Sequence, residues 1–320
     1  MNLGLATREA YGRTLAALGR DNPNIVVLDA DLSKSTMTKL FADEFPDRFF
    51  NAGIAEQNMV GMAAGLASCG KIVFASTFAV FLPGRCFDQL RMSVAYSDMN
   101  VKIASSHSGL SVGEDGASHQ AIEDIALMRS LPGFRIIVPA DEIAAAWATR
   151  TAASQIGPFY LRLGRPKYPI IYDKTQEFVL GKAIELREGQ DATIVANGRM
   201  LVEALEAADV CASKGLSVRV LDMHTIEPID REAIVKAADE TGAIVVAEEH
   251  LVNGGMGSAI SQVLVEEYPV PMEFVAIKQC YGQSGDPAGL LKVYGLTAEN
   301  IVSAVEKIVA RKQANGVTEA

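Results

Sequence analysis

The chain has 320 residues, 49% of them hydrophobic and 21% charged, which predicts an ordinary globular protein of about two domains. Its net charge of −10 argues against nucleic-acid binding and provides no basic patch for a membrane surface. Four widely spaced cysteines, without metal or redox spacing, indicate reduced thiols in a cytoplasmic protein. The N-terminal segment is typical of an amphipathic helix and not of a signal peptide, and no apolar run is long enough to span a bilayer.

Short β-rich runs alternate with helical patterns in the first half of the chain. The expected strands are residues 25–29, 72–75, 101–105, 136–139 and 159–163. The expected helices lie near residues 8–19, 55–68, 87–96, 121–130 and 142–154. This alternation predicts an α/β domain with a mostly parallel sheet over residues 1–170.

The same alternation restarts after a weakly periodic stretch that contains Pro, Tyr and Gly, and we place a linker there at residues 171–185. Strands are expected at residues 193–196, 217–222, 243–248 and 273–277, and helices at residues 201–213, 231–239 and 257–267. The sequence therefore predicts a second, smaller α/β domain over residues 186–320, also with a mostly parallel sheet.

Glu56 is the only charged residue between Arg48 and Lys71, in a segment rich in Ala, Gly and Met. A carboxylate in such surroundings should be desolvated, which raises its proton affinity. It can then hydrogen-bond a ring nitrogen and move a proton with it, as the aminopyrimidine of thiamine diphosphate requires. The alternative is that Glu56 begins a helix and complements the helix dipole. The local pattern does not separate the two interpretations.

The segment 107–120 follows an expected strand and so lies at the carboxyl edge of a parallel sheet, where ligands collect. It holds two of the four histidines, His107 and His119, with Glu114 and Asp115 between them. Histidines and carboxylates can hydrogen-bond sugar hydroxyls and shuttle protons. The segment lacks a helical histidine pair and a nearby cysteine, so we assign no metal ligands. A solvated structural loop is the alternative.

Arginines and phenylalanines lie at other predicted strand ends. Arg8 opens the first helix, and Arg162 and Arg165 end the last strand of the first domain. Arginine suits bidentate phosphate contacts, so the three together favour a phosphorylated substrate, although each alone is typical of a solvated strand end. Phe78 or Phe81 could stack on a flat heteroaromatic ring, although core packing is the commoner role of such residues.

A glycine-rich turn at residues 253–259 follows a strand of the second domain. Such a turn at the start of a helix can cradle an anion, and tight helix–strand packing explains it equally well. His224 and His250 lie near strand ends in the same domain and are compatible with structural roles.

Taken together, these segments resemble the transketolase family, specifically its C-terminal half, over nearly the whole chain. The most specific matches are residues 53–59 (GIAEQNM), 113–120 (GEDGASHQ), 131–134 (LPGF) and 138–141 (VPAD). The resemblance implies a pyrimidine-binding domain followed by the family's C-terminal domain. It also implies thiamine diphosphate and Mg²⁺ as cofactors, and transfer of a two-carbon ketol unit between phosphorylated sugars.

The resemblance assigns cofactor roles to three residues. Glu56 matches the glutamate that pairs with N1′ of the cofactor's pyrimidine, and Phe78 and Phe81 match the aromatic residues that line the pyrimidine pocket. We favour Phe81 as the stacking ring, although the sequence does not separate the two. Because the cofactor supplies the electron sink, the protein's part is to orient it and to exchange a proton with it.

The resemblance also assigns substrate roles. His107, Asp115 and His119 match residues that contact the sugar, and His107 and His119 join Glu56 in the expected catalytic set. Arg8, His107 and Arg162 match residues that hold the substrate phosphate.

One expected motif is absent from the sequence. Full-length members carry an N-terminal domain with a G-D-G…N motif that holds Mg²⁺ and the diphosphate, whereas Asp286 in the segment SGDP lacks the second glycine. The start at Met1, directly before the first helix, is expected to be a natural beginning. We therefore expect the C-terminal subunit of a split transketolase, inactive alone. An N-terminal subunit would complete an α2β2 heterotetramer with the cofactor in the interface.

One departure from the family pattern leaves the substrate open. Asp29 stands where the family often has a serine. A carboxylate there would repel a phosphate, so either Asp29 points away or the donor differs from ordinary pentulose phosphates.

Two alternative functions are kept. A relative acting on pyruvate would be a deoxyxylulose-phosphate synthase or the β-subunit of a 2-oxo-acid dehydrogenase. The synthase is expected to carry an arginine where Ser108 stands, and the β-subunit lacks a close counterpart of GEDGASHQ. A non-catalytic scaffolding partner is the other alternative, and the joint presence of Glu56, His107 and His119 argues against it.

Overall fold

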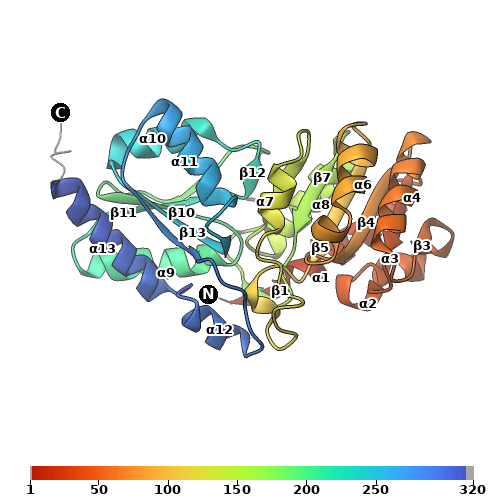
Figure 1. Cartoon of the computed structure of the whole chain (residues 1–320), viewed down its shortest axis with the longest axis horizontal. Helices are drawn as coiled ribbons and strands as arrows, with labels where there is room; N and C mark the ends of the chain where they lie inside the picture. The colour runs from red at the N-terminus through yellow and green to blue at the C-terminus, as the bar shows by residue number, and fades with distance from the viewer. Residues whose placement is uncertain (1, 315–320) are drawn as a thin grey trace.

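The computed structural model describes residues 2–314, which form two α/β domains lying side by side (Figure 1). The first domain is built on a seven-stranded sheet in the order β12-β6-β7-β5-β4-β2-β3. Its strands are β2 (Ile25–Asp29), β3 (Phe49–Asn51), β4 (Ile72–Phe78), β5 (Val101–Ser106), β6 (Arg135–Ile137), β7 (Phe159–Arg162) and β12 (Thr225–Glu227). All neighbours are parallel except β12 and β6. Strands β2 and β5 are buried along their whole length, as expected for a parallel sheet covered on both faces.

Helices cover both faces of this sheet. The helical elements are α1 (Thr7–Asp21), α2 (Ser33–Thr36), α3 (Lys39–Glu44), η1 (Pro46–Arg48), α4 (Glu56–Ser68), α5 (Leu82–Arg85), α6 (Phe87–Gln89), the π-helix η2 (Leu90–Ala95), η3 (Leu110–Val112), α7 (Asp124–Arg129) and α8 (Glu142–Ser154). Helices α1, α3 and α8 pack on one face, and α4, η2 and α7 on the other. Helix α8 begins where the Asp141 carboxylate accepts hydrogen bonds from the N–H groups of Ile143 and Ala144, both at 2.9 Å.

The second domain is built on a five-stranded sheet in the order β14-β13-β10-β11-β9. Its strands are β9 (Ile184–Arg187), β10 (Ala192–Ala196), β11 (Val218–Asp222), β13 (Ile244–Leu251) and β14 (Met272–Ile277). Its helices are α9 (Met200–Ser213), α10 (Arg231–Thr241), α11 (Met256–Glu267), α12 (Pro287–Val293) and α13 (Ala298–Ala314). Helices α10 and α11 lie on one side of the sheet, and α9 and α13 on the other (Figure 1).

The two domains are joined by shared structure. Strand β12 comes from the second half of the chain but pairs antiparallel with β6 at the edge of the first sheet. A small separate sheet pairs β1 (Leu3–Ala6) with β8 (Lys167–Pro169). One apolar cluster runs from the α4 face of the first sheet to α10 and α11 of the second domain, so the domains share a continuous core.

The predicted α/β class, with two domains and mostly parallel sheets, is confirmed. The strand at residues 25–29 and the helix at residues 142–154 coincide with β2 and α8. The helix expected at residues 87–96 is instead a short α6 followed by the π-helix η2. Strand β9 begins at Ile184, inside the predicted linker, and residues 315–320 of the predicted second domain lie outside the described part.

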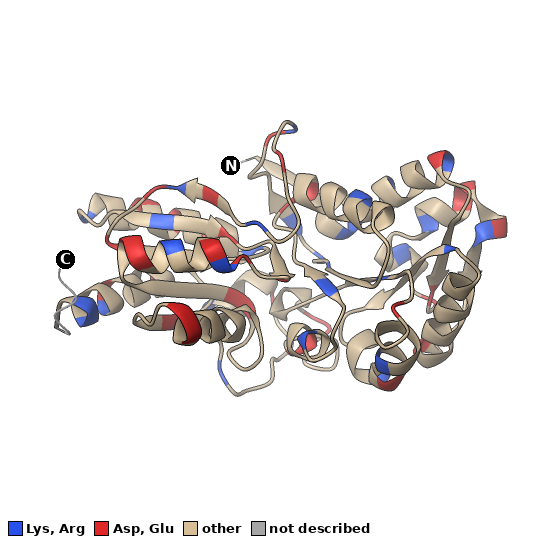
Figure 2. Cartoon of the chain, turned by 90° about the horizontal axis from the view of Figure 1, so that it is seen from above, with Lys and Arg blue, Asp and Glu red and all other residues tan. Residues whose placement is uncertain are grey.

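Charged residues of both signs are distributed over both domains (Figure 2). In residues 2–314, none of the helices combines the length and apolar character needed to cross a bilayer.

Candidate active site

The candidate site forms at the carboxyl edge of the first sheet. Glu56 follows β3, Phe78 ends β4, and His107 follows β5, and these three strands run in the same direction within one sheet. Their carboxyl ends therefore meet at one edge, which is where ligands bind in open α/β sheets.

Glu56 is the first residue of helix α4 and is only 6% exposed, as the sequence predicts. It is not unpartnered, however, because its Oε1 accepts a hydrogen bond from Nη1 of Arg85 at 2.7 Å. The guanidinium of Arg85 also lies over the ring of Phe81, 4.1 Å from the ring centroid. A hollow of about 430 Å³ opens here. It is lined by Ile54, Ala55, Glu56, Gln57, Asn58 and Arg85. Sequence analysis did not single out Arg85, because no local pattern shows that it faces Glu56.

Four aromatic rings continue the site from Phe81. The rings of Phe78 and Phe81 are near-parallel with centroids 5.8 Å apart, and Phe78 stacks on His107 at 3.8 Å. His119 meets Phe81 edge-on at 5.3 Å. The two phenylalanines and two histidines singled out from the sequence therefore lie in mutual contact. Phe78 is buried against His107, whereas Phe81 is only half-buried.

His107 occupies a constrained position. Its backbone φ is +59°, a left-handed conformation that is uncommon for a residue with a side chain. Its Nδ1 shares a hydrogen bond of 2.9 Å with the hydroxyl of Ser106. Burial, reinforced by the positive charges of Arg8 and Arg165, lowers the pKa of His107 to about 3. His107 is therefore a neutral imidazole at physiological pH.

Arg8 and Arg165 form the positive side of the site. Arg8 donates from Nη1 to the carbonyl of Ser35 at 2.6 Å and from Nε to the carbonyl of Arg165 at 3.3 Å. Burial lowers the pKa of Arg8. Arg165 donates from Nη1 to Glu114 at 3.2 Å and lies 4.0 Å from the carboxylate of Asp115. Arg8, His107 and Asp115 are thus brought together, with Arg165 between them.

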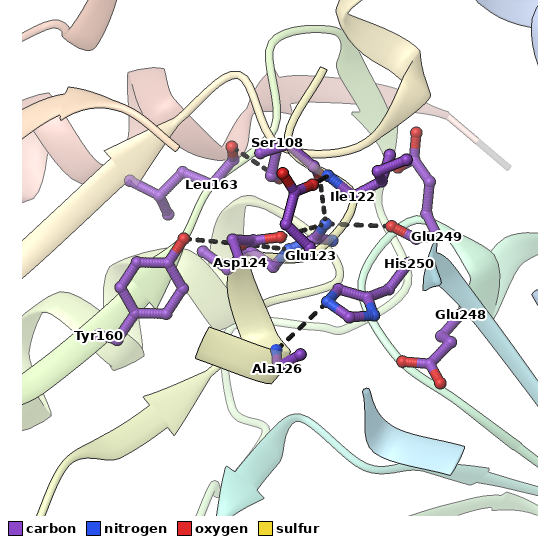
Figure 3. Close-up of polar contacts among 12 residues, drawn as sticks. Ser108, Ile122, Glu123, Asp124, Ala126, Tyr160, Leu163, Glu248, Glu249 and His250 are labelled. Atoms are coloured by element: carbon purple, nitrogen blue, oxygen red, sulfur yellow. Dashed lines mark hydrogen bonds and ion pairs between the residues drawn. The ribbon is translucent and has the colours of Figure 1, made fainter. Parts of the chain in front are cut away.

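Arg162, expected at the substrate phosphate, is instead part of the interior. It is 4% exposed and forms a two-point ion pair with Asp124 of α7, at 2.8 and 3.0 Å. Its Nη2 also donates to the carbonyls of Ala121 and Glu249. Figure 3 shows the hydroxyl of Tyr160 bonded to the same aspartate, at 2.7 Å. These donors are committed to buried acceptors, so the expected phosphate role of Arg162 is corrected to a structural one. For the substrate anion we propose Arg165 instead of Arg162.

Asp29 points away from the site. Its carboxylate accepts hydrogen bonds from the hydroxyls of Thr36 and Thr38 at 2.7 and 2.8 Å, and from the Leu32 N–H at 2.6 Å. The side chain is fully buried, and burial raises its pKa. These bonds agree with the first explanation, that Asp29 points away from the substrate, and they show that Asp29 shapes the loop that carries Ser35.

The glycine-rich turn at residues 253–259 is no open anion cradle. The carboxylate of Glu248 accepts hydrogen bonds from the N–H groups of Met256 and Gly257, both at 2.8 Å, and so fills the N-terminus of α11. Asp286 plays the same part for α12 by accepting from Gly289 N–H at 2.9 Å. His250 is a buried structural histidine. Its Nε2 accepts a hydrogen bond from the Ala126 N–H (Figure 3), and its Nδ1 bonds the carbonyl of Leu251.

Over residues 2–314, no three histidine, cysteine, aspartate or glutamate side chains converge as metal ligands.

Comparison with known proteins places these features in a family. A model of the transketolase pyrimidine-binding domain matches residues 4–170, and a model of the transketolase C-terminal domain matches residues 181–301. The fold is therefore that of the pyrimidine-binding and C-terminal domains of a thiamine-diphosphate enzyme. The chain belongs to the transketolase family.

Relatives of two lengths are found. A protein of Methanocaldococcus jannaschii, named as a transketolase C-terminal section, is 46% identical over 93% of this chain and 94% of its own length. A 6-deoxy-6-sulfo-D-fructose transketolase subunit of a Clostridium species is 41% identical over 95% of each chain. Rat transketolase is 42% identical over 96% of this chain but only 49% of its own length. The chain therefore spans about half of such long relatives.

A solved structure agrees with this assignment. A split-gene transketolase, described as an inactive β4 tetramer, has a TM-score of 0.90 and 53% identity, and covers 96% of this chain and 99% of its own. Each relative named here is a transketolase, so the pyruvate-acting alternatives are not favoured.

Proposed function

We propose that this chain is the C-terminal subunit of a split transketolase and that, with an N-terminal subunit, it transfers a two-carbon ketol unit between anionic sugars. One observation carries the residue assignments. A buried carboxylate, Glu56, and a half-buried aromatic ring, Phe81, both contact the same guanidinium, that of Arg85. One planar group therefore donates an N–H to the acid while its face lies against the ring.

The geometry suits the aminopyrimidine of thiamine diphosphate. When bound, the cofactor supplies the electron sink for cleavage of the bond next to a ketose carbonyl. Glu56 would hold and exchange a proton with the ring nitrogen N1′, and Phe81 would stack on the ring. Because the guanidinium of Arg85 covers the face of Phe81, Arg85 has to move aside on cofactor binding. We assign the stacking role to Phe81 and not to Phe78, whose ring packs on His107.

The substrate would lie beyond the aromatic rings. Because Nδ1 of neutral His107 is bonded to the hydroxyl of Ser106, its Nε2 is the ring nitrogen left to bond a sugar hydroxyl. His119 and Asp115 lie on the same loop, where their side chains are accessible. Arg8 and Arg165 would hold the terminal anion.

A sulfonated donor is a second candidate. The Clostridium relative is named for a sulfo-sugar and is 41% identical to this chain. A sulfonate, like a phosphate, presents oxygen acceptors that arginine can bind. Arg8 and Arg165 could therefore bind either anion. Activity assays with phosphorylated and sulfonated ketoses are needed to tell the two donors apart.

The partner subunit would complete the site. We assign Mg²⁺ and the diphosphate to an N-terminal subunit because the two matched models cover only the pyrimidine-binding and C-terminal domains. An α2β2 heterotetramer is the closed assembly that places the cofactor between subunits. We place the protein in the cytoplasm because its four cysteines are unpaired.

The test is reconstitution. The purified chain and its N-terminal partner are mixed with thiamine diphosphate and Mg²⁺, and then with ketose phosphates, a 6-sulfonated ketose or pyruvate. An aldehyde product from a ketose, formed only when both chains are present, supports the proposal. Turnover of pyruvate without turnover of any ketose would contradict it and favour the pyruvate-acting alternative.

A further inference from the structure

The loop that carries the substrate-facing residues, here called the substrate loop (residues 107–120), is held by the second domain. Glu249 of β13 is 4% exposed and directs its carboxylate at Ser111. Its Oε1 accepts from the Ser111 N–H at 2.6 Å, and its Oε2 accepts from the Ser111 hydroxyl at 3.2 Å. A Cβ added at Gly109, which has a φ of +76°, would lie 2.3 Å from the Glu249 carboxyl carbon. The loop is therefore shaped around this carboxylate.

A second attachment lies at the end of the substrate loop. The Nε2 of buried Gln120 donates to the carbonyl of Gln283 at 3.0 Å, and it also lies 3.3 and 3.4 Å from the carbonyls of Leu110 and Gly113. Gln283 belongs to the segment between β14 and α12, here called the strap (residues 278–286). The side-chain amide of Gln120 thus links the turn at residues 110–113 of the substrate loop to the strap of the second domain.

Close packing supports the same attachment. A Cβ added at Gly282 of the strap would lie 1.9 Å from Gln120 Oε1, and one added at Gly116 of the loop would lie 2.4 Å from the hydroxyl of Ser284. Neither position has room for a side chain without a shift of its neighbour. The strap therefore lies directly against the loop.

The second domain is a firm anchor for these contacts. Strand β13 lies between β14 and β10 within its sheet, and the carbonyl of Glu249 accepts from Arg162 of the first domain at 3.0 Å. The side chains of Glu248 and Glu249 point in opposite directions from β13 (Figure 3), as neighbours on a strand do. Only Glu249 reaches the substrate loop, because Glu248 faces the N-terminus of α11.

We propose that the second domain acts as a clamp on the substrate loop, and that Glu249 and Gln120 are positioning residues for His107, Asp115 and His119. This inference rests on the proposed function for the roles of the three positioned residues. The clamp gives the C-terminal domain a part in donor recognition, although neither Glu249 nor Gln120 is placed in contact with cofactor or sugar.

The test compares two adjacent buried glutamates in the reconstituted enzyme. Glu249→Ala leaves the Ser111 N–H without its partner, and we expect kcat/KM for the ketose donor to fall by about 10- to 100-fold, the scale of a displaced binding group. The Kd for thiamine diphosphate should change much less than the donor kcat/KM, because Glu56 and Phe81 belong to other elements and only His119 of the loop meets the Phe81 ring. Glu249→Gln keeps an acceptor for Ser111 and should restore most of the donor kcat/KM.

Glu248→Ala is the matched control, because it removes two backbone hydrogen bonds from the same strand without touching the loop. It should lower the Tm while leaving the donor kcat/KM nearly unchanged. Equal losses of donor kcat/KM in Glu248→Ala and Glu249→Ala, or no recovery in Glu249→Gln, would overturn the clamp.

Hydrogen–deuterium exchange of the isolated chain separates this inference from the proposed function. Exchange at residues 107–120 should be faster in Glu249→Ala than in the wild type, and it should be unchanged in Glu248→Ala. Gln120→Ala should also raise the exchange, and this variant replaces Glu249→Ala if that protein does not fold. This readout requires no enzyme activity. If exchange at residues 107–120 is unchanged in Glu249→Ala or in Gln120→Ala, the clamp is overturned. If the wild-type mixture shows no ketol transfer, only the proposed function is contradicted.

Discussion

The ring of His107 lies on the ring of Phe78, with centroids 3.8 Å apart and planes inclined by 22°. Phe78 ends the central strand β4, so the imidazole rests on a group that is fixed by the sheet. The left-handed backbone of His107 makes this stacking possible, because it turns the chain sharply after β5. A residue proposed to bind the sugar is therefore in direct contact with the aromatic wall proposed to enclose the cofactor.

The buried imidazole predicts a specific pH response. Because the folded pKa of His107 is about 3 and its ordinary value is 6.5, the unfolded chain binds the proton more readily below pH 6.5. Stability is thus unaffected above pH 6.5 and is lost as the pH falls from 6.5 towards 3, by about 2 kcal/mol at pH 5. His107→Asn, which tolerates a positive φ, should remove this part of the acid sensitivity in urea unfolding at pH 7 and pH 5. A His107 ring resonance that titrates near pH 6.5 would contradict the prediction.

Replacing Glu56 by Gln should nearly abolish turnover. The amide preserves the shape of the side chain but cannot exchange a proton with a ring nitrogen, so we expect kcat to fall by about 10²- to 10⁴-fold. The measurement is ketol transfer by the reconstituted complex, with circular dichroism to confirm the fold. Glu44→Gln, which alters an exposed ion pair with Arg20, is the control and should be fully active. Full activity of the Glu56 variant would remove this residue from the proposed mechanism.

Arg165→Gln should weaken donor binding without harming the fold. Its guanidinium is about one-third exposed and bonds the Val112 carbonyl and Glu114 of the substrate loop, so the packing of the two sheets does not depend on it. Losing a charge-assisted contact to the donor anion should raise KM for a phosphorylated or sulfonated ketose by about 10- to 100-fold. A short ketose without an anionic group should show a much smaller change. Equal effects on charged and uncharged donors would argue against an anion site.

Arg162→Gln should behave in the opposite way. The substitution leaves the fully buried carboxylate of Asp124 without its cation, and breaking such a pair costs about 3–5 kcal/mol. Urea unfolding of the isolated chain measures this loss. If the variant is as stable as the wild type but has a raised donor KM, the original assignment of Arg162 to the substrate phosphate would be restored.

Asp29→Ala should loosen the loop that holds Arg8. The hydroxyls of Thr36 and Thr38 would lose their common acceptor, at a cost of about 1–3 kcal/mol for groups left unsatisfied in the interior. The donor KM should rise as well, because Ser35 in this loop orients Arg8. Kinetics and thermal unfolding of Asp29→Ala test both effects, with Asp31→Asn as the exposed control because asparagine tolerates the φ of +64° at that position. An unchanged KM would separate Asp29 from the substrate site.

The elements predicted well are those whose signal lies within their own segment. Strand β2 and helix α8 carry continuous apolar or capping patterns, and both were predicted with their observed bounds. Strands β1, β3, β8 and β12 have only three or four residues, so their pairing depends on distant partners. A short run with no periodicity of its own gives no basis for prediction.

The site was predicted unevenly for the same reason. His107 follows β5, a strand that the sequence predicts, so topology alone places it at the carboxyl edge of the sheet. Glu56 follows β3, which the sequence does not predict, and only its uncharged surroundings singled it out. The contacts of two arginines could not be predicted, because their partners come from other elements. Arg162 forms an ion pair with Asp124 on α7, and Arg85 forms an ion pair with Glu56.

Strand β12 has a consequence for any attempt to divide this protein. Because it completes the first sheet from beyond the linker, a fragment ending at residue 185 would expose the bare backbone edge of β6. An unpaired edge recruits other chains, so this fragment should aggregate on expression. The boundary between the two family domains is therefore a poor place to cut the gene, even though it lies between two recognisable modules.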